Sequence, residues 1–229
     1  MLAMSAEDVF QTQINLSEID SPKSRFDITF NKPYIGFKDW PKNDDDNVYY
    51  AYANSYAFGA YLMRNYGGID LINLIATIPY SDEEAVTRSL QMLGYNENFE
   101  SVFKKFGAVY VLTEKDSLLT LNKEVKQNFN KVNYELTSID LSNYVFNSFK
   151  TLDDLRSYVA TNLYNSEFAY FQGAKAVYLC GPEIYKSSYD MSEAINPYGF
   201  TVFYAGKVQS GQTLSINRDS NLSVTLVLK

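Results

Sequence analysis

The side chains that could carry chemistry in this sequence are carboxylates, tyrosines and lysines, because the chain contains no histidine and one cysteine, Cys180. Without histidine, this chain alone cannot form a Ser-His-Asp or Cys-His triad or the H-E-x-x-H zinc motif. A single cysteine without histidine also excludes a structural zinc site built from this chain and an intrachain disulfide. No metal-ligating residue is predicted, and catalysis would depend on the remaining polar groups or on a metal bound through oxygen.

The overall charge limits the classes of partner. The formal net charge is −7, which argues against nucleic acid, for which a basic face is expected, and against adhesion to anionic lipid. The sequence has no run of about 18 apolar residues, so no membrane span is predicted. Residues 1–13 lack the basic and apolar regions of a signal peptide.

The first half of the chain has the patterns of helices that would position these side chains. Residues 1–13 carry one apolar stripe, and residues 48–68 form a longer, tyrosine-rich segment. The longer segment has no charged residue from Tyr56 to Met63, which is typical of a buried helix. We expect Gly59 to allow close approach of another backbone and Gly67-Gly68 to end the helix.

Shorter helices are predicted next, with short connections between antiparallel neighbours. Residues 69–78 are apolar, and residues 81–94 begin with the capping box Ser81-x-x-Glu84. Residues 98–112 place their aromatic side chains at helical spacing, a strongly amphipathic pattern.

The pattern changes after about residue 113. Residues 152–164 could form one more helix and residues 174–182 a strand, whereas residues 198–228 alternate with period 2 between turn residues, as an antiparallel meander does. The predicted fold class is α+β, with a helical unit at 1–115, a mixed connecting region at 116–190 and an antiparallel β-meander at 191–229.

The helical unit resembles a known family. The segments SYAFGAYLMRNYGGIDLINLI and AVTRSLQMLGYNENFESVFKKF are similar to the C-terminal half of bacterial zinc metallopeptidases of the hyicolysin type, which are gluzincins. That group has Tyr-x-x-Gly-x-x-Leu on a helix and then Leu-Gly near a Phe-rich helix. The matching residues here are Tyr56, Gly59, Leu62, Leu93, Gly94, Phe99 and Phe103.

The first residues extend this resemblance, which covers about residues 1–112. The C-terminal β region is also similar to the end of the same family, but less specifically. MLAMSAEDVF looks like the helix that follows the family's Trp-x-Asn-Glu segment, which supplies the third zinc ligand. The resemblance implies the C-terminal half of a gluzincin-like catalytic domain that lacks H-E-x-x-H, its general-base glutamate and the glutamate ligand. Zinc is thus implied for the full-length family and not for this chain.

The resemblance also implies the site residues. Tyr56 matches the helix tyrosine that, in aminopeptidase relatives, donates a hydrogen bond to the oxyanion. Tyr52, one turn earlier, is the alternative. Glu7 and Asp8 would not bind the metal themselves but would orient the histidines that bind zinc. Each residue also has a structural interpretation: a core tyrosine for Tyr56, and a surface carboxylate pair for Glu7 and Asp8.

These observations leave more than one function open. The first is a fragment of a zinc metalloendopeptidase that is inactive alone. To act on peptide or protein substrates, it would need a missing N-terminal segment or subunit that carries H-E-x-x-H. The resemblance to the family also implies an extracytoplasmic location. The alternative is a non-catalytic surface or binding module with a tyrosine-rich groove. A glycosidase with two carboxylates ranks last, because the sequence indicates no particular pair.

The fragment hypothesis makes a structural prediction. The missing half would have covered the apolar faces of the first helix and of the tyrosine-rich helix. We therefore expect an exposed apolar patch at Leu2, Val9, Tyr52, Tyr56 and Met63, because such a patch marks an absent partner surface.

Overall fold

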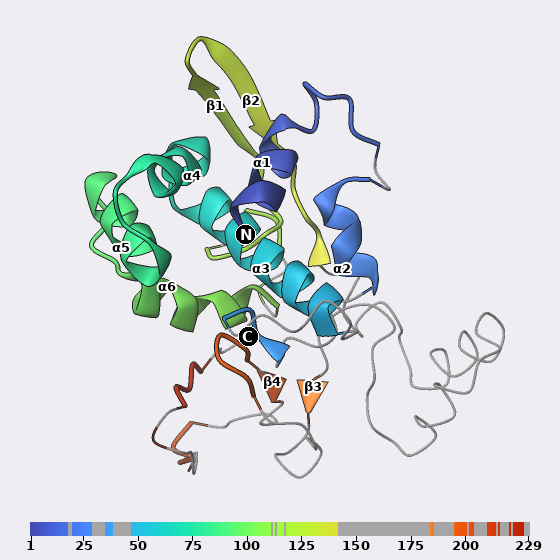
Figure 1. Cartoon of the computed structure of the whole chain (residues 1–229). Coiled ribbons are helices and arrows are strands. Elements are labelled where there is room, and N and C mark those ends of the chain that lie inside the picture. The colour runs from blue at the N-terminus through green and yellow to red at the C-terminus, as the bar shows by residue number, and fades with distance from the viewer. Residues whose placement is uncertain are drawn as a thin grey trace, which may run out of the picture.

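The protein is described by a computed structural model that covers residues 1–17, 20–28, 35–38, 47–110, 112, 114–116, 118–141, 184–185, 195–200, 202–203, 210–213, 215, 220 and 222–226. Within these residues, helices fill the first half of the chain and short strands follow (Figure 1). The predicted α+β class is therefore confirmed.

Helix α3 (Asn47–Asn65) is the central element of the helical part (Figure 1). It contacts α1 (Leu2–Phe10), the short α2 (Arg25–Ile28), α4 (Gly68–Thr77) and α6 (Phe99–Phe106). Its side chains from Tyr56 to Met63 are at most 1% exposed, so the prediction of a buried helix is confirmed. Neighbours on several sides explain why this helix is apolar almost all round.

Three glycines, Gly59 and the pair Gly67-Gly68, allow close packing around α3. A Cβ atom on Gly59 would lie 2.3 Å from Ser5 Oγ and 2.9 Å from Met1 Cγ, so α1 can approach α3 closely only because this residue has no side chain. Gly67 and Gly68, with φ of +107° and +63°, form the joint between α3 and α4. A Cβ atom on Gly68 would lie 1.8 Å from Gln127 Oε1.

Helices α4, α5 (Asp82–Met92) and α6 follow one another as contacting neighbours, and the 3-10 helix η3 (Gly107–Tyr110) extends α6. The predicted capping box at Ser81 is wrong: Ser81 is the N-cap of α5, but its hydroxyl lies 3.3 Å from the Asp82 carboxylate and makes no capping hydrogen bond. A capping box does form at α6, where Asn98 and Ser101 bond reciprocally.

Aromatic rings fill the space between α3 and α6. Phe58 of α3 contacts Phe99, Phe103 and Phe106 of α6 in edge-to-face geometry, with ring centroids 5.3–5.7 Å apart. Edge-to-face pairs of this kind are favourable beyond the area they bury. The segment 195–200 adds Tyr198, whose ring centroid lies 4.9 Å from that of Phe99. The Phe-rich pattern of α6 therefore reflects a core face.

An antiparallel hairpin occupies a region where no strand was predicted. Strands β1 (Val125–Phe129) and β2 (Val132–Leu136) pair with Val125 opposite Leu136, and both turn residues have positive φ, as in a type I′ turn. The hairpin contacts α4 through β1 and α1 through β2, and it stands at one end of the helical part (Figure 1).

The C-terminal prediction is only partly covered by the described residues. Strand β4 (Val202–Phe203) pairs in parallel with β3 (Ile184–Tyr185), which belongs to the region before the predicted meander. The antiparallel meander itself stays a prediction, because most of its residues lie outside the described ranges. The predicted helix at 152–164, the strand at 174–182 and Cys180 lie outside the described residues.

The part of the chain that the structure describes includes no helix with the length and apolar character needed to cross a bilayer.

Candidate functional site

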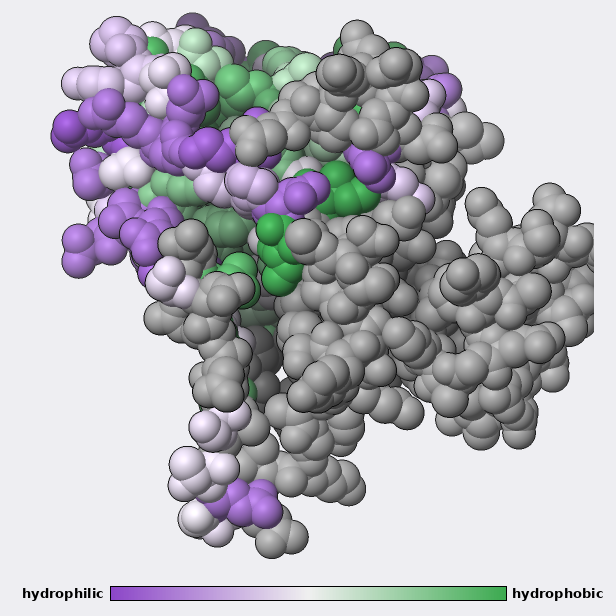
Figure 2. Space-filling view, turned by 60° about the horizontal axis from the view of Figure 1, so that its bottom comes forward, coloured by the Kyte–Doolittle hydropathy of each residue, from purple (hydrophilic) through white to green (hydrophobic). Residues whose placement is uncertain are grey.

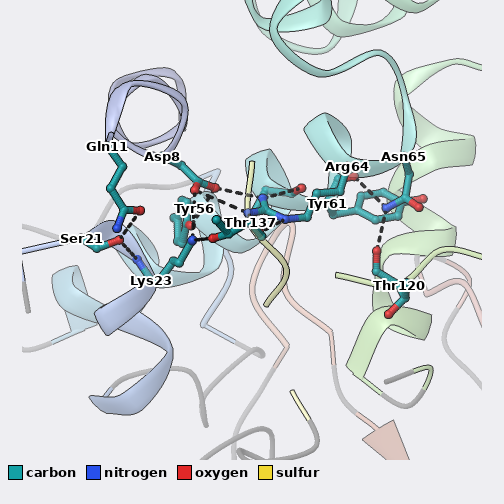
Figure 3. Close-up of polar contacts among 11 residues, drawn as sticks. Asp8, Gln11, Ser21, Lys23, Tyr56, Tyr61, Arg64, Asn65, Thr120 and Thr137 are labelled. Carbon is teal, nitrogen blue, oxygen red and sulfur yellow. Dashed lines mark hydrogen bonds and ion pairs between the residues drawn. The ribbon is translucent and has the colours of Figure 1, made fainter. Parts of the chain in front are cut away.

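The carboxylate of Asp8 is the centre of a buried polar network between α1 and α3 (Figure 3). The Tyr56 hydroxyl donates a hydrogen bond to Asp8 Oδ2 over 3.0 Å. Arg64 Nη1 donates to the same oxygen over 2.9 Å, and Arg64 Nη2 lies 3.4 Å from Oδ1. The structure thus brings together two of the predicted site residues, Tyr56 and Asp8, and places Tyr56 on the face of α3 that meets α1.

Helical spacing explains this geometry. Tyr56, Ala60 and Arg64 are four residues apart and therefore share one face of α3. Arg64 is directed back along that face, with Nη1 3.4 Å from the carbonyl oxygen of Ala60. Its Nε and Nη2 groups donate to the carbonyl oxygen of Thr137 over 3.2 and 2.7 Å. One guanidinium group therefore links α1, α3 and the segment after β2.

A second cation approaches the same carboxylate. Lys23 Nζ, from the 3-10 helix η1 (Pro22–Ser24), lies 3.9 Å from Asp8 Oδ1 and donates to the Thr137 hydroxyl. The side chains of Asp8 and Arg64 are both 0% exposed. A buried ion pair is tolerated when both partners have good geometry and further hydrogen bonds, and this pair has both. The local arrangement is one carboxylate between two cations.

The Tyr56 hydroxyl lies inside the molecule and not in a cleft. Tyr56 is 0% exposed, and its ring packs against Phe26 with centroids 5.4 Å apart. A surface hollow of about 400 Å³ is found elsewhere, between the end of α1 and the hairpin, and none of the predicted site residues lines it. The buried Tyr56 can hold α1 in place through its hydrogen bond to Asp8. Its hydroxyl does not face a space large enough for a ligand.

The other two predicted site residues have different surroundings. Tyr52 is 41% exposed, and the guanidinium carbon of Arg25 lies 5.6 Å from its ring centroid, which is cation–π geometry. Glu7 is half-buried on α1 and points about 100° away from Asp8 around the helix. Asp8 is therefore the predicted carboxylate that meets Tyr56.

Arg64 belongs to this site, although it was not predicted. It is the only charged residue in α3, and it lies on the face of Tyr56. A lone charge on an otherwise apolar, buried helix requires a buried partner of opposite sign. Together with the acidic end of the first helix, that requirement was a usable signal for the pair Asp8–Arg64.

A separate tyrosine pair lies further along α3. The hydroxyl groups of Tyr61 and Tyr66 are 3.1 Å apart, and burial, followed by the contact with Tyr66, raises the pKa of Tyr61 well above its ordinary value. Asn65 Nδ2 donates to the carbonyl oxygens of Tyr61 and Thr120 (Figure 3). Tyr61 is therefore neutral at physiological pH and has a structural role.

The donor groups in this site do not fit a zinc ion. Zinc in proteins takes nitrogen and sulfur ligands, often with one carboxylate, and this sequence has no histidine. Within the described ranges, no three His, Cys, Asp or Glu side chains are grouped so that they could hold a metal. Asp8 faces Arg64 at 2.9 Å, where a metal cation would be repelled.

The predicted exposed patch is wrong for most of its members. Val9, Tyr56 and Met63 are 2%, 0% and 1% exposed, and Leu2 packs against the same core. Phe26, Leu136, Ile139 and Leu141 belong to this core and come from the segments that follow α1 and β1. On the face drawn in Figure 2, hydrophobic residues of the described part are seen in small groups between hydrophilic ones.

Comparisons with known proteins add no assignment to this geometry: no family model, no curated protein and no solved structure matches this chain.

Proposed function

We propose that this chain is the helical part of a zinc-metallopeptidase-like catalytic domain of the hyicolysin, or gluzincin, type, and that it does not hydrolyse peptides alone. The observation that carries the proposal is the packing of α1 on α3 with Tyr56 and Gly59 between them. The sequence resemblance assigns these two helices to opposite sides of the family's zinc site. Their contact through Tyr56 and Gly59 supports the proposal because it brings the two helices of the resemblance side by side.

The state of Tyr56 explains why the chain alone is inactive in this proposal. A phenol has one hydrogen to donate, and Tyr56 donates it to Asp8. The hydroxyl therefore cannot stabilise an oxyanion without leaving this partner. The side chains present also do not fit zinc, so the metal ligands would have to come from a segment outside residues 1–229. Peptide or protein substrates follow only for a domain completed in that way.

The DNA that precedes the codon for Met1 provides the test. We expect it, or a neighbouring gene, to encode H-E-x-x-H followed by Trp-x-Asn-Glu, in frame or after a frameshift. Co-expression of that segment with this chain should give proteolysis that a chelator stops. In the completed domain, Y56F should lower the rate by about 10²–10³, as loss of one oxyanion donor does. DNA without any such motif would overturn the proposal.

A self-contained binding module is the second candidate, and the burial of Val9 and Met63 favours it. These side chains are covered by the chain's own residues, so the described part does not show the bare face that a missing half would leave. Tyr49 and Tyr52 are 62% and 41% exposed at the start of α3 and could contact a partner.

The solution state separates the two candidates. A monomer with one cooperative unfolding transition, measured by light scattering and urea denaturation, favours the binding module. Self-association that disappears only when the upstream segment is co-expressed favours the peptidase fragment.

A further inference from the structure

We propose that Arg64 is a positioning residue that holds the Tyr56 hydroxyl in its donating direction through the carboxylate of Asp8. The geometry does not depend on the proposed function, but the use of Tyr56 as an oxyanion donor rests on it. In this role, Arg64 would determine whether the Tyr56 hydroxyl keeps its hydrogen bond to Asp8 or donates to another acceptor.

The first step of the argument is that Tyr56 and Arg64 share one oxygen atom. Asp8 Oδ2 accepts from the Tyr56 hydroxyl at 3.0 Å and from Arg64 Nη1 at 2.9 Å. Arg64 Nη2 lies 3.4 Å from the other oxygen, Oδ1. Because the guanidinium group is planar, two contacts to one carboxylate set both its place and its rotation. The acceptor direction offered to Tyr56 is thereby set by Arg64.

The second step is that Arg64 is itself held from its other side. Its Nε and Nη2 groups both donate to the carbonyl oxygen of Thr137, a backbone atom just after β2. The guanidinium group is therefore fixed between a main-chain oxygen and the carboxylate. The order of contacts runs from Thr137 through Arg64 and Asp8 to the hydroxyl of Tyr56 (Figure 3).

The third step is that lysine cannot replace arginine here. A lysine ammonium group is a compact point charge without the planar fork, so it cannot keep two contacts to Asp8 and two to Thr137. Lys23 Nζ is at 3.9 Å from Asp8 Oδ1, on the oxygen that Tyr56 does not use, so it offers charge without setting the position of Oδ2. R64K therefore retains the charge and removes the positioning.

The test is NMR of the full chain labelled with 13C at the Cζ atom of tyrosine, a nucleus that senses hydrogen bonding of the phenol. Y56F assigns the Tyr56 signal by removing it. We expect R64K to shift the Tyr56 signal and to leave the Tyr61 signal in place, because Tyr61 lies on the same helix but bonds to Tyr66. R88K, a change in a half-exposed arginine that pairs with Glu84, should shift neither signal.

A folded R64K chain with an unmoved Tyr56 signal overturns the proposal, as does an equal shift of the Tyr61 signal. If R64K does not fold, the reciprocal measurement decides. Y56F should shift the 15Nη1 resonance of Arg64, the nitrogen that shares Asp8 Oδ2 with Tyr56, and leave the Arg88 resonances unchanged. An unmoved Arg64 Nη1 resonance overturns the proposal. Neither measurement uses zinc, peptide or a second segment, so the positioning role and the proposed function can fail separately.

Discussion

Asp8 joins α1 to α3 through its buried ion pair with Arg64 and its hydrogen bond from Tyr56. D8N keeps the size of the side chain but leaves the Arg64 guanidinium, 0% exposed, without its counter-charge. Removal of one partner of a buried pair typically costs about 3–5 kcal/mol of unfolding free energy. We expect D8N to lose an amount near the lower end of this range in urea denaturation, since Thr137 still accepts from Arg64.

The matched control for D8N is the neighbouring substitution E7Q. Glu7 is half-buried on the same helix, so E7Q changes the charge of α1 equally without touching Arg64. It should change the unfolding free energy by less than about 0.5 kcal/mol. Equal losses for D8N and E7Q would mean that charge on α1, and not the buried pair, determines the stability.

Glu97 gives a pH dependence at the surface. Hydrogen bonds from Lys105 and then from Ser101 hold the pKa of Glu97 below its ordinary value of 4.5. A carboxyl group with a lowered pKa in the folded state stabilises the fold above its unfolded pKa, and this contribution is lost as the pH falls through that value to the lowered one.

We therefore expect E97Q to lower the unfolding free energy at pH 7 by less than about 1 kcal/mol, because the pair is partly exposed. The difference between E97Q and the parent chain should disappear below the lowered pKa. Urea denaturation at a series of pH values from 7 downward measures this. A difference that does not shrink as the pH falls below 4.5 would show that Glu97 acts through packing and not through its charge.

Some of the site could be predicted at the residue scale, and some could not. The family resemblance singled out both Tyr56 and Asp8, but it did not predict the hydrogen bond between them. The resemblance assigns no role to Arg64. From helical periodicity alone, Arg64 is only a polar residue near the C-terminal end of α3. The contact of Thr137 with Arg64 could not be predicted from the sequence, because the Thr137 backbone oxygen meets Arg64 only when the hairpin is folded against α1.

At the scale of elements, the approach of α1 to α3 depends on the missing side chain of Gly59. G59A would place a Cβ atom 2.3 Å from Ser5 Oγ. Alanine improves helix propensity by up to about 1 kcal/mol, but overpacking of this kind costs about 1–3 kcal/mol. We expect a net loss of stability of about 1 kcal/mol in thermal or urea unfolding.

Ser5 supplies the control for that substitution. Its hydroxyl is buried and finds no hydrogen-bond partner among the residues that the structure describes, so S5A removes an unsatisfied polar group and the atom that would clash. The double variant S5A/G59A should regain most of the stability lost in G59A, because S5A alone is expected to be neutral or stabilising. Without such a recovery, close packing at Ser5 is not the reason for glycine at position 59.

The elements themselves differ in how far the sequence determines them. Helices α3 to α5 have strong local patterns, and their predicted ends lie within about three residues of the observed ones. The helix predicted at 98–112 is too long, because α6 ends at Phe106 and continues as the 3-10 helix η3. The hairpin VKQNF–VNYEL was missed because its hydrophobic alternation is weak: polar Gln127 takes an inward position between Val125 and Phe129. What orders it is the contact of β1 with α4 and of β2 with α1, a tertiary effect that overrides weak local propensity.

At the scale of the whole molecule, the composition gives a prediction that does not depend on any single contact. A chain without histidine and with one cysteine lacks the ligands of a tight zinc site. We expect metal analysis after dialysis to find no stoichiometric zinc, and casein to stay intact with or without added zinc. Chelator-sensitive proteolysis by the purified chain alone would refute the proposed function.

The Gln127 side chain that fills the space beside Gly68 has a consequence for how the molecule assembles. Its Oε1 accepts from the Ile69 amide over 2.8 Å, and its Nε2 donates to the Gly67 carbonyl oxygen over 3.0 Å. The corner between two consecutive helices is thus completed by a residue 58–60 positions away. Contacts at such a separation form late, since a long loop must close first. The Ile69 amide should therefore become protected from hydrogen exchange together with the hairpin amides during refolding, and later than the amides inside α3.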